Sequence, residues 1–307
     1  MGFNEAQTKA ICHKNGPAMV LAGPGSGKTL VITRRVEYLI KKYGVRPEQI
    51  LVITFTKAAA KEMRERFARI TKDDRFPVTF GTFHGIYYGI LKWAYRMNAS
   101  NIFSEEEKMM LLREVIAGME LEIEDEKEFL QGIASEIGQI KNNRLSLEEY
   151  ESSNCSDQMF RQIYEEYERR RKLLKKIDFD DMLVLCYELF QKRPDILQMW
   201  QKKFQYILID EFQDINQVQY DVIRMLALPE NNLFIVGDDD QSIYRFRGAR
   251  PEIMLGFSKD YPNAKSIILD VNYRSTKAVV SAARRVIERN KNRYQKEIIT
   301  VNEQGDN

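Results

Sequence analysis

A glycine-rich run near the start of the chain has the residue types of a phosphate-binding loop. It follows the apolar residues 18–21 and reads Ala22, Gly23, Pro24, Gly25, Ser26, Gly27, Lys28, Thr29. In such a loop the backbone N–H groups surround an anion at a helix N-terminus, a lysine reaches the β- and γ-phosphates, and a hydroxyl binds Mg²⁺. Ala22 departs from the strict pattern, which begins with glycine. The run predicts a site for a nucleoside triphosphate, with Lys28 on the phosphates and Thr29 on Mg²⁺.

Two adjacent carboxylates, Asp210 and Glu211, end a second apolar run at residues 206–209. Taken alone, an acidic pair at a strand end is an ordinary exposed feature about as often as it is a functional site. At a strand tip beside a phosphate loop, however, Asp210 would hold Mg²⁺ through water and Glu211 would polarise the attacking water. The pair therefore predicts nucleotide hydrolysis.

A third apolar run, residues 233–236, leads into an acidic and then aromatic-basic segment. Gln241 in this segment is a neutral amide that could sense a γ-phosphate. The residues after it, Tyr244, Phe246 and Arg247, alternate aromatic faces with positive charge. That mixture suits single-stranded nucleic acid, whose bases stack on aromatic rings while phosphates meet arginine. An aromatic-rich turn alone is more often packing than recognition.

The elements that must position these residues are short β-branched runs separated by helical patterns. They predict buried parallel strands at residues 18–21, 50–55, 77–80, 206–209, 233–236 and 266–269. Residues 104–176 differ, with long charged helical patterns and two expected capping boxes, Ser104 with Glu107 and Ser146 with Glu149. We therefore expect an α/β domain interrupted by a helical insertion.

Composition narrows the protein class but not the partner. The 307 residues are 44% hydrophobic and 30% charged, as in ordinary globular proteins, and the net charge of +2 is too small to indicate a nucleic-acid partner. Three widely spaced cysteines, Cys12, Cys155 and Cys186, favour neither disulfides nor zinc. With no apolar run near the ~20 residues of a membrane span, we expect a cytoplasmic protein without membrane contact.

One basic run, Arg169 to Lys172, invites a DNA-backbone interpretation. Glutamates at 165, 166 and 168 precede it, so helical spacing gives opposite-charge pairs three and four residues apart. A solvated helix face is the favoured interpretation, and a DNA contact is the minor alternative.

Taken in order, the motifs resemble those of the UvrD/Rep-like superfamily 1 DNA helicases, almost from end to end. Besides the phosphate loop, the similar runs are Phe3 to Gln7, Thr54 to Ala59, Thr82 to Gly85, Asp178 to Asp181, Asp210 to Asp214, Gly237 to Gly248 and Asn272 to Thr276. The order of so many matches makes the resemblance specific.

The resemblance implies an ATP-driven motor moving 3′ to 5′ on single-stranded DNA, or on a duplex with a 3′ single-stranded tail. By position, Gln7 would contact adenine, Tyr273 would stack on it, and Gln241 and Arg274 would contact the γ-phosphate, Arg274 as a charge-stabilising finger. DNA contacts would fall to Phe55, Thr56, His84, Tyr244, Phe246, Arg247. Phe246 stands where many members have tryptophan, which keeps the stacking face but loses the indole donor.

The resemblance also implies a domain plan. Residues 1–100 and 177–268 would form the first RecA-like domain, residues 101–176 the helical insertion, and residues 269–307 the start of a second RecA-like domain. Because few residues follow Arg274, we expect that second domain to be truncated and the chain alone to hydrolyse ATP weakly. A full site would then need the second motor domain in cis; other subunits are not predicted.

Two other functions remain open. One is a nucleotide-gated DNA-binding module that binds ATP without turnover. The other is a phosphotransferase using the same phosphate loop on a small acceptor, which leaves the Gln7 run and the aromatic-basic segment after Asp238 unexplained.

Overall fold

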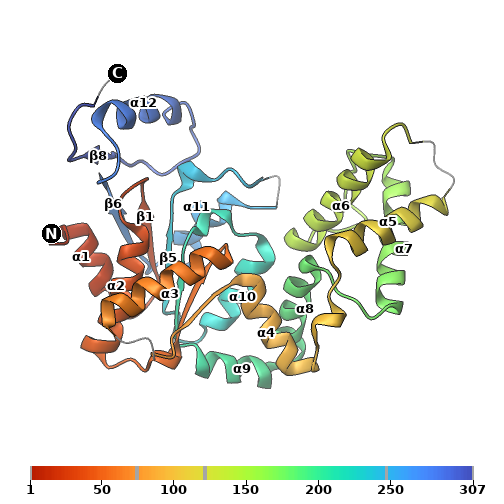
Figure 1. Cartoon of the computed structure of the whole chain (residues 1–307), viewed down its shortest axis with the longest axis horizontal. Helices are drawn as coiled ribbons and strands as arrows, with labels where there is room; N and C mark the ends of the chain where they lie inside the picture. Colours follow the sequence, from red (N-terminus) through yellow and green to blue (C-terminus); the bar gives the residue numbers. More distant parts are fainter. Residues whose placement is uncertain (1, 73–75, 120–122, 246–247, 306–307) are drawn as a thin grey trace.

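A six-stranded sheet carries the functional elements of the protein in this computed structural model (Figure 1), which describes residues 2–72, 76–119, 123–245 and 248–305. The sheet order is β3-β2-β4-β5-β1-β6, and neighbouring strands run parallel. Its strands are β1 (Ala18–Ala22), β2 (Ile50–Thr54), β3 (Thr79–Thr82), β4 (Tyr206–Ile209), β5 (Leu233–Gly237) and β6 (Lys265–Leu269). The expected strands are confirmed, with ends that differ by at most two residues.

Successive side chains of each strand point to opposite faces of the sheet, and a hydrophobic core lies on each face. In β1, Met19 and Leu21 enter one core, while Val20 and Ala22 enter the other. Both sets are buried, which explains why the strands are continuously apolar. The helices on the Val20 face are α1 (Glu5–Cys12), α2 (Lys28–Tyr43) and α3 (Lys57–Thr71).

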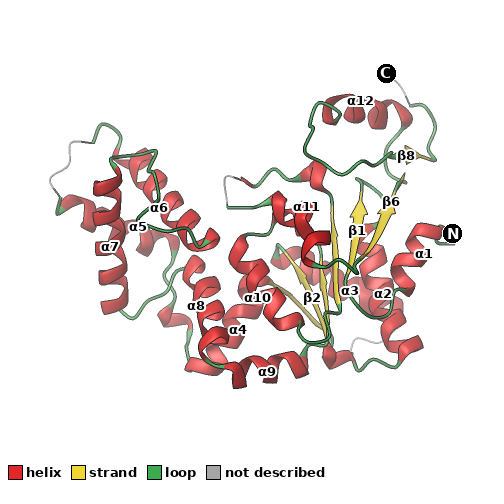
Figure 2. Ribbon diagram, turned by 180° about the vertical axis from the view of Figure 1, so that it is seen from behind, coloured by secondary structure: helices red, strands yellow, loops and turns green. Residues whose placement is uncertain are grey.

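The Met19 face is covered by the helices that follow β3, β4 and β5 and by two from the middle of the chain (Figure 2). They are α4 (Phe83–Tyr95), α8 (Phe179–Lys192), α9 (Pro194–Lys203), α10 (Gln217–Ala227) and α11 (Pro251–Asp260). Helices therefore cover both faces, as right-handed crossovers between parallel strands require. The structure is the expected α/β fold, consistent with a RecA-like phosphate-loop domain.

Three helices, α5 (Glu105–Ala117), α6 (Glu126–Asn143) and α7 (Asp157–Leu173), form a lobe beside the sheet (Figure 1). The lobe has its own apolar core, which includes Leu112, Ile137 and Phe160. Its two ends meet: the Phe103 N–H donates to the Ile177 carbonyl at 2.9 Å, and the Ile177 N–H to the Asn101 carbonyl at 2.7 Å. The chain thus leaves the sheet domain and returns at one point.

Of the two expected capping boxes, one is confirmed and one is wrong. Ser104 caps α5 and Glu107 returns the bond, as expected. Ser146 begins no helix, because α6 ends at Asn143 and α7 starts only at Asp157, where Ser156 accepts from the Met159 N–H. The Ser-x-x-Glu spacing is a local signal, and the chain there follows a loop instead.

The last part of the chain forms a short two-stranded parallel pair and one helix. These elements are β7 (Val271–Asn272), α12 (Lys277–Ile287) and β8 (Ile299–Thr300). They lie beyond the carboxyl end of β6 and above β1 (Figures 1 and 2). Short 3-10 turns occur at Pro47–Gln49, Ala99–Asn101, Phe212–Asp214 and Asp239–Gln241. Among the described helices, none is long and apolar enough to cross a membrane.

Candidate nucleotide site and nucleic-acid cavity

Parallel pairing brings the predicted motifs to one edge of the sheet. Leu21 of β1 pairs with Gly237 of β5, and Ile209 of β4 pairs with Ile235, so the loops after these strands begin side by side. The phosphate loop, the acidic pair after Ile209 and the acidic segment after Gly237 are these loops. This is the edge at which α/β sheets bind ligands.

The phosphate loop needs its glycines for space and for backbone angles. Gly25 has a φ of +67° and Gly27 a φ of +87°, both in the left-handed region. A Cβ at Gly25 would lie 2.8 Å from Asn272 Oδ1, and one at Gly23 would lie 2.5 Å from the end of the Ile298 side chain. Ser26 closes the turn by donating its hydroxyl to the Gly23 carbonyl at 2.7 Å. The loop ends where α2 begins, at Lys28.

Lys28 contacts Glu211, the predicted water-activating residue. Its Nζ donates to Glu211 Oε2 at 2.9 Å, and Glu211 has a φ of +52°, which is unusual for a residue with a side chain. Thr29 is half-buried beside Lys28 in the first turn of α2. Lys28 and Glu211 neutralise each other here, and phosphate would compete for the same ammonium group.

Asp210 has the properties expected of a metal ligand. It is 4% exposed, and its Oδ1 has no hydrogen-bond partner among the described residues. Burial, with the adjacent negative charge of Glu211, raises the pKa of Asp210 to about 7. A buried carboxylate oxygen without a partner costs free energy, which a cation would offset. Asp210 and Thr29 therefore fit Mg²⁺, which would supply charge on the phosphates and lower that pKa.

Gln213 joins the ends of β4 and β5. Its Nε2 donates to Glu211 Oε2 at 3.0 Å and to Asp214 Oδ2 at 3.1 Å, and its Oε1 accepts from the Asp238 N–H at 3.0 Å. Gln241 in turn donates to Asp238 Oδ2. The Gln213 side chain, only 2% exposed, thus links Glu211, the predicted water-activating carboxylate, with the segment that bears Gln241. No sequence signal beyond its place in the Asp210 to Asp214 run singled it out.

The predicted adenine contacts lie on the other side of the phosphate loop. Gln7 donates to the Ser26 carbonyl at 3.1 Å, and its Oε1 accepts from the Asn4 N–H in a capping box. The Tyr273 hydroxyl accepts from Asn4 Nδ2 at 3.0 Å, and the ring is 42% exposed. Gln7 and Tyr273 therefore share one neighbour, Asn4, next to the loop. Their contact with adenine stays a prediction.

Arg274 approaches the phosphate loop from the segment after β7. Its Cβ would lie 2.8 Å from a Cβ at Gly25, and its N–H donates to Asn272 Oδ1 at 2.7 Å. Asn272 also accepts from the Ser275 N–H, and the Gly25 carbonyl accepts from the Tyr273 N–H. Asn272, which the sequence reasoning did not single out as a site residue, is the 3% exposed anchor of this turn. The exposed Arg274 side chain starts next to the loop.

Four of the six predicted nucleic-acid residues line one cavity of about 710 Å³ together with Glu211 and Gln241. The four are Phe55, Thr56, His84, Tyr244. The other two, Phe246 and Arg247, lie outside the described residues. One hollow therefore reaches from the predicted nucleotide chemistry to the predicted strand contacts.

The cavity wall offers ring faces, neutral polar groups and the carboxylates of Asp180, Glu211 and Asp214. The rings of Phe55 and Phe83 meet edge to face at 5.8 Å, and His84 meets Phe179 in the same way at 5.7 Å. Burial lowers the pKa of His84, against the opposing charge of Asp180, so the imidazole is neutral at pH 7. Thr56 accepts from the Ala59 N–H and caps α3. The wall thus suits bases better than phosphates.

The sequence reasoning missed several polar residues of this wall. Asn142 of α6 donates to Asp180 Oδ1 at 2.8 Å and accepts from Asn216 Nδ2 at 3.1 Å. Asp180 lies in the first turn of α8, and Asn216 caps the start of α10. The chain of bonds therefore joins the lobe to the sheet domain. Of the residues in this chain of bonds, only Asp180, in the Asp178 to Asp181 run, had a sequence signal, and Asn142 had none.

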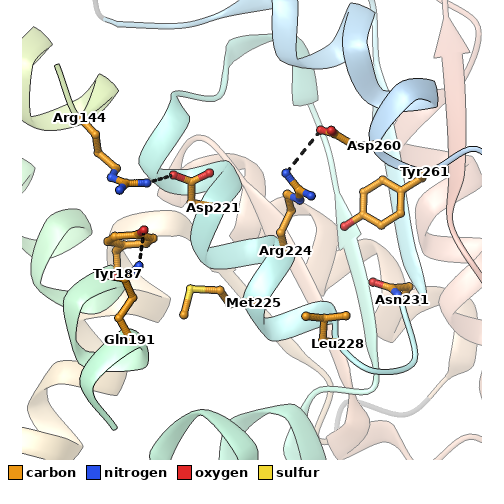
Figure 3. Close-up of a pocket in the computed structure, with 10 residues that line it drawn as sticks. All are labelled: Arg144, Tyr187, Gln191, Asp221, Arg224, Met225, Leu228, Asn231, Asp260 and Tyr261. Atoms are coloured by element: carbon orange, nitrogen blue, oxygen red, sulfur yellow. Dashed lines mark hydrogen bonds and ion pairs between the residues drawn. The ribbon is translucent and has the colours of Figure 1, made fainter. Parts of the chain in front are cut away.

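A second cavity, of about 510 Å³, lies between α8, α10 and the end of α6 (Figure 3). Its charged groups are already paired: Arg144 with Asp221 at 2.7 Å, and Arg224 with Asp260 at 3.7 Å. Arg144 also lies over the Tyr187 ring, 4.1 Å from its centre. These pairs leave little demand for a charged ligand.

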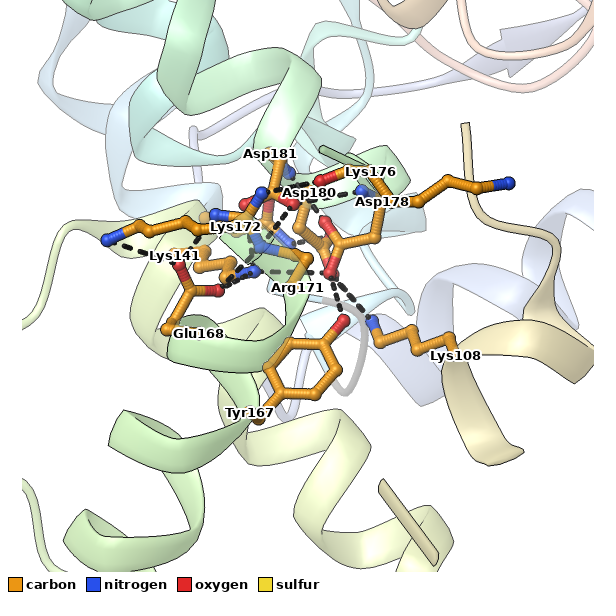
Figure 4. A network of polar contacts seen from close by, with 11 residues as sticks. Lys108, Lys141, Tyr167, Glu168, Arg171, Lys172, Lys176, Asp178, Asp180 and Asp181 are labelled. Carbon is orange, nitrogen blue, oxygen red and sulfur yellow. Dashed lines mark hydrogen bonds and ion pairs between the residues drawn. The ribbon is translucent and has the colours of Figure 1, made fainter. Parts of the chain in front are cut away.

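A buried network of charges fixes the lobe to α8 (Figure 4). Lys141 of α6 lies 3.1 Å from Asp178 and 2.8 Å from both Asp181 and Glu168. Asp178 and Asp181 also cap α8 reciprocally. Arg171 pairs with Glu168 and Asp181, and Arg169 and Arg170 pair with Glu166. Arg169 and Arg170 thus pair within their own helix, as the favoured interpretation of the basic run expects, whereas a solvated face is wrong for Arg171, which is buried against Asp181 of α8.

The family model for the UvrD/REP helicase N-terminal domain matches residues 3–262. The putative ATP-dependent DNA helicase YjcD of Bacillus subtilis is 46% identical over 303 residues, which cover 96% of this chain and 40% of that protein. The ATP-dependent DNA helicases PcrA of B. subtilis and of Staphylococcus aureus are 38% and 37% identical, over 99% of this chain and 42% of each relative. The chain thus spans about two fifths of these relatives' length. It belongs to the UvrD/REP helicase family and carries that family's N-terminal domain.

Proposed function

We propose that this chain is the ATP-binding part of an ATP-dependent DNA helicase that moves 3′ to 5′ along single-stranded DNA. The observation that carries the proposal is the shared cavity, in which Glu211 and Gln241 line one wall while Phe55, His84 and Tyr244 line another. Hydrolysis at the first wall would change the contacts at the second. The family match and the names of the relatives support the same function, and the direction of movement rests on the family resemblance alone.

In the proposed reaction, Lys28 and the backbone of the phosphate loop bind the phosphates. Asp210 and Thr29 would hold Mg²⁺, which would supply positive charge to the bound phosphates. Glu211 leaves Lys28 when phosphate arrives and orients the attacking water, while Arg274 and Gln241 contact the γ-phosphate. Gln7 and Tyr273 hold the adenine. The distance of 2.9 Å between Lys28 and Glu211 supports this exchange of partners.

We further propose the division into a first RecA-like domain of residues 1–100 and 177–268, an insertion of residues 101–176, and the start of a second domain at residue 269. The separate core of α5, α6 and α7 supports the insertion boundaries.

The test is ATP hydrolysis by the chain with and without a single-stranded oligonucleotide. Lys28→Ala should abolish both nucleotide binding and turnover, whereas Lys42→Ala, at an exposed lysine of the same helix, should leave both unchanged. Turnover that DNA stimulates and Lys28→Ala removes would support the proposal. DNA affinity that changes with ATPγS without any turnover would instead indicate a nucleotide-gated DNA-binding module. Failure to bind ATP at all would refute both.

A further inference from the structure

A buried lysine near the end of the chain is surrounded by three consecutive aspartates. The Lys296 side chain is 1% exposed, and its Nζ lies 2.7 Å from Asp238 Oδ1 and 3.0 Å from Asp240 Oδ2, with Asp239 also in contact. Burial alone would lower the pKa of Lys296, but the carboxylates outweigh it and raise that pKa. The ammonium group is therefore charged and fixed. The proposed reaction gives it no part.

The segment around Lys296 touches both loops that face the proposed γ-phosphate. Arg293 forms two bonds of 2.6 Å to the Asp240 carboxylate, and the Tyr294 N–H donates to Asp239 Oδ2 at 2.7 Å. On the other side, the Ile298 side chain fills the space that a Cβ at Gly23 would need. The segment 293–298 thus lies against the phosphate loop after β1 and the acidic turn after β5.

Asp238 connects this segment with Gln241. One carboxylate oxygen binds Lys296, and the other accepts from Gln241 Nε2. Gln241 must leave Asp238 to reach a γ-phosphate, so the orientation and charge of Asp238 set how easily it moves. Without the ammonium group, the buried carboxylates of Asp238 and Asp239 would repel each other, Asp240 would keep only Arg293, and the turn of residues 239–241 would change shape.

We propose that Lys296 is a positioning residue for γ-phosphate recognition: it holds Asp238 so that Gln241 can pass from this carboxylate to the nucleotide. The proposal rests on the proposed function and deepens it. Arg293 and Tyr294 bind the same turn. A movement of that turn on binding of a γ-phosphate would therefore also move the segment 293–298, which connects α12 with β8. The lysine itself touches no nucleotide.

The test compares the dissociation constants of Mg·ATPγS and Mg·ADP, measured by calorimetric titration of the full chain. We expect the wild-type protein to prefer ATPγS. Lys296→Met should reduce this preference by about tenfold, in the range of coupling between contacting groups, with ADP affinity changed less than about twofold. Lys296→Arg, which keeps the charge, should restore most of the preference. Lys291→Met, at an exposed lysine five residues away, is the matched control.

The outcomes separate the two proposals. A wild-type chain that binds neither nucleotide refutes the proposed function. If it binds both equally, or if Lys296→Met keeps the wild-type preference, the role of Lys296 is overturned while nucleotide binding stands. Equal losses for ATPγS and ADP, without rescue by Lys296→Arg, would show a merely structural lysine. Should Lys296→Met fail to fold, Arg293→Gln decides, because it loosens the same turn and should weaken ATPγS binding selectively by about threefold.

Discussion

Two groups of buried aspartates behave differently in this molecule. At the strand ends, Asp210 is 4% exposed, and one of its oxygens has no partner among the described residues. At the junction of lobe and sheet domain, Asp178 is 2% exposed, yet it accepts from Lys141, Tyr167 and the Asp181 N–H. The first carboxylate keeps one oxygen that no described residue binds, while the second carboxylate is bonded by side chains and backbone of the same structure.

A shifted pKa does not distinguish these groups, but their hydrogen bonds do. Burial raises the pKa of Asp210 to about 7 and that of Asp181, in the junction, to about 6. Both oxygens of Asp181 are nevertheless bonded, to Lys141 and to the Asp178 N–H. An unpartnered oxygen, which Asp214 also has among the described residues, therefore sets the strand-end carboxylates apart from Asp178 and Asp181 and is the feature we expect of a ligand-binding carboxylate.

The largest expected effect is on turnover at the strand ends. Asp210→Asn removes the proposed Mg²⁺ ligand charge, so ATP hydrolysis should fall by at least ~10²-fold, the size seen when a charge-stabilising group is lost. Steady-state hydrolysis at saturating Mg²⁺ measures it. Asp195→Asn, at an exposed aspartate of α9, is the control. Unchanged turnover in Asp210→Asn would end the contrast between the two groups.

At the junction the same change should act on stability. Asp178→Asn leaves Lys141 and Lys108 without their shared carboxylate, so the free energy of unfolding should fall by ~3 kcal/mol, as for other broken buried ion pairs. Urea unfolding measures this loss, and calorimetry should show unchanged ATP affinity. A variant as stable as the wild type would mean that Asp178 is as poorly compensated as Asp210.

A pH series sharpens the comparison. A carboxyl whose pKa is higher in the folded than in the unfolded state binds its proton more tightly when folded, so the protein loses stability as pH rises and that proton leaves. For Asp210, the free energy of unfolding should therefore fall between pH ~4, the ordinary aspartate pKa, and pH about 7. Without Mg²⁺, the Tm should therefore decline over this range, and less so in Asp210→Asn. Asp178 has the opposite sign: its pKa lies below the usual range, so its contribution disappears only as pH falls below ~4. If the Tm fell equally with pH in the wild type and in Asp210→Asn, the raised pKa of Asp210 would be refuted.

The smallest effect is expected on the outer face of the lobe. Arg169 pairs with Glu166 within α7, and its side chain is 60% exposed. Because such pairs are screened by solvent, Arg169→Gln should leave the Tm and the affinity for a single-stranded oligonucleotide unchanged. A clear loss of oligonucleotide affinity would revive the interpretation of this run as a DNA contact.

Local signals carried much of the prediction. The strands were predictable because β1 and β5 are apolar at every position, and the phosphate loop because its residue types are nearly unique to that task. What escaped depends on contacts between distant parts of the chain. Gln213, Asn142 and Lys296 matter through partners 25, 74 and 57 residues away. Hydrophobic periodicity carries no information about such pairings.

The meeting of the lobe's two ends at Phe103 and Ile177 has a consequence for how this protein can change over generations. A segment that starts and finishes at one place adds no displacement to the path of the chain, so strands β3 and β4 keep their places whatever is threaded between them. Helices α5 to α7 can lengthen, shorten or be replaced by another module, provided that the new segment still places cationic side chains against the Asp178 to Asp181 run. The sheet domain and the lobe can thus evolve at different speeds within one gene.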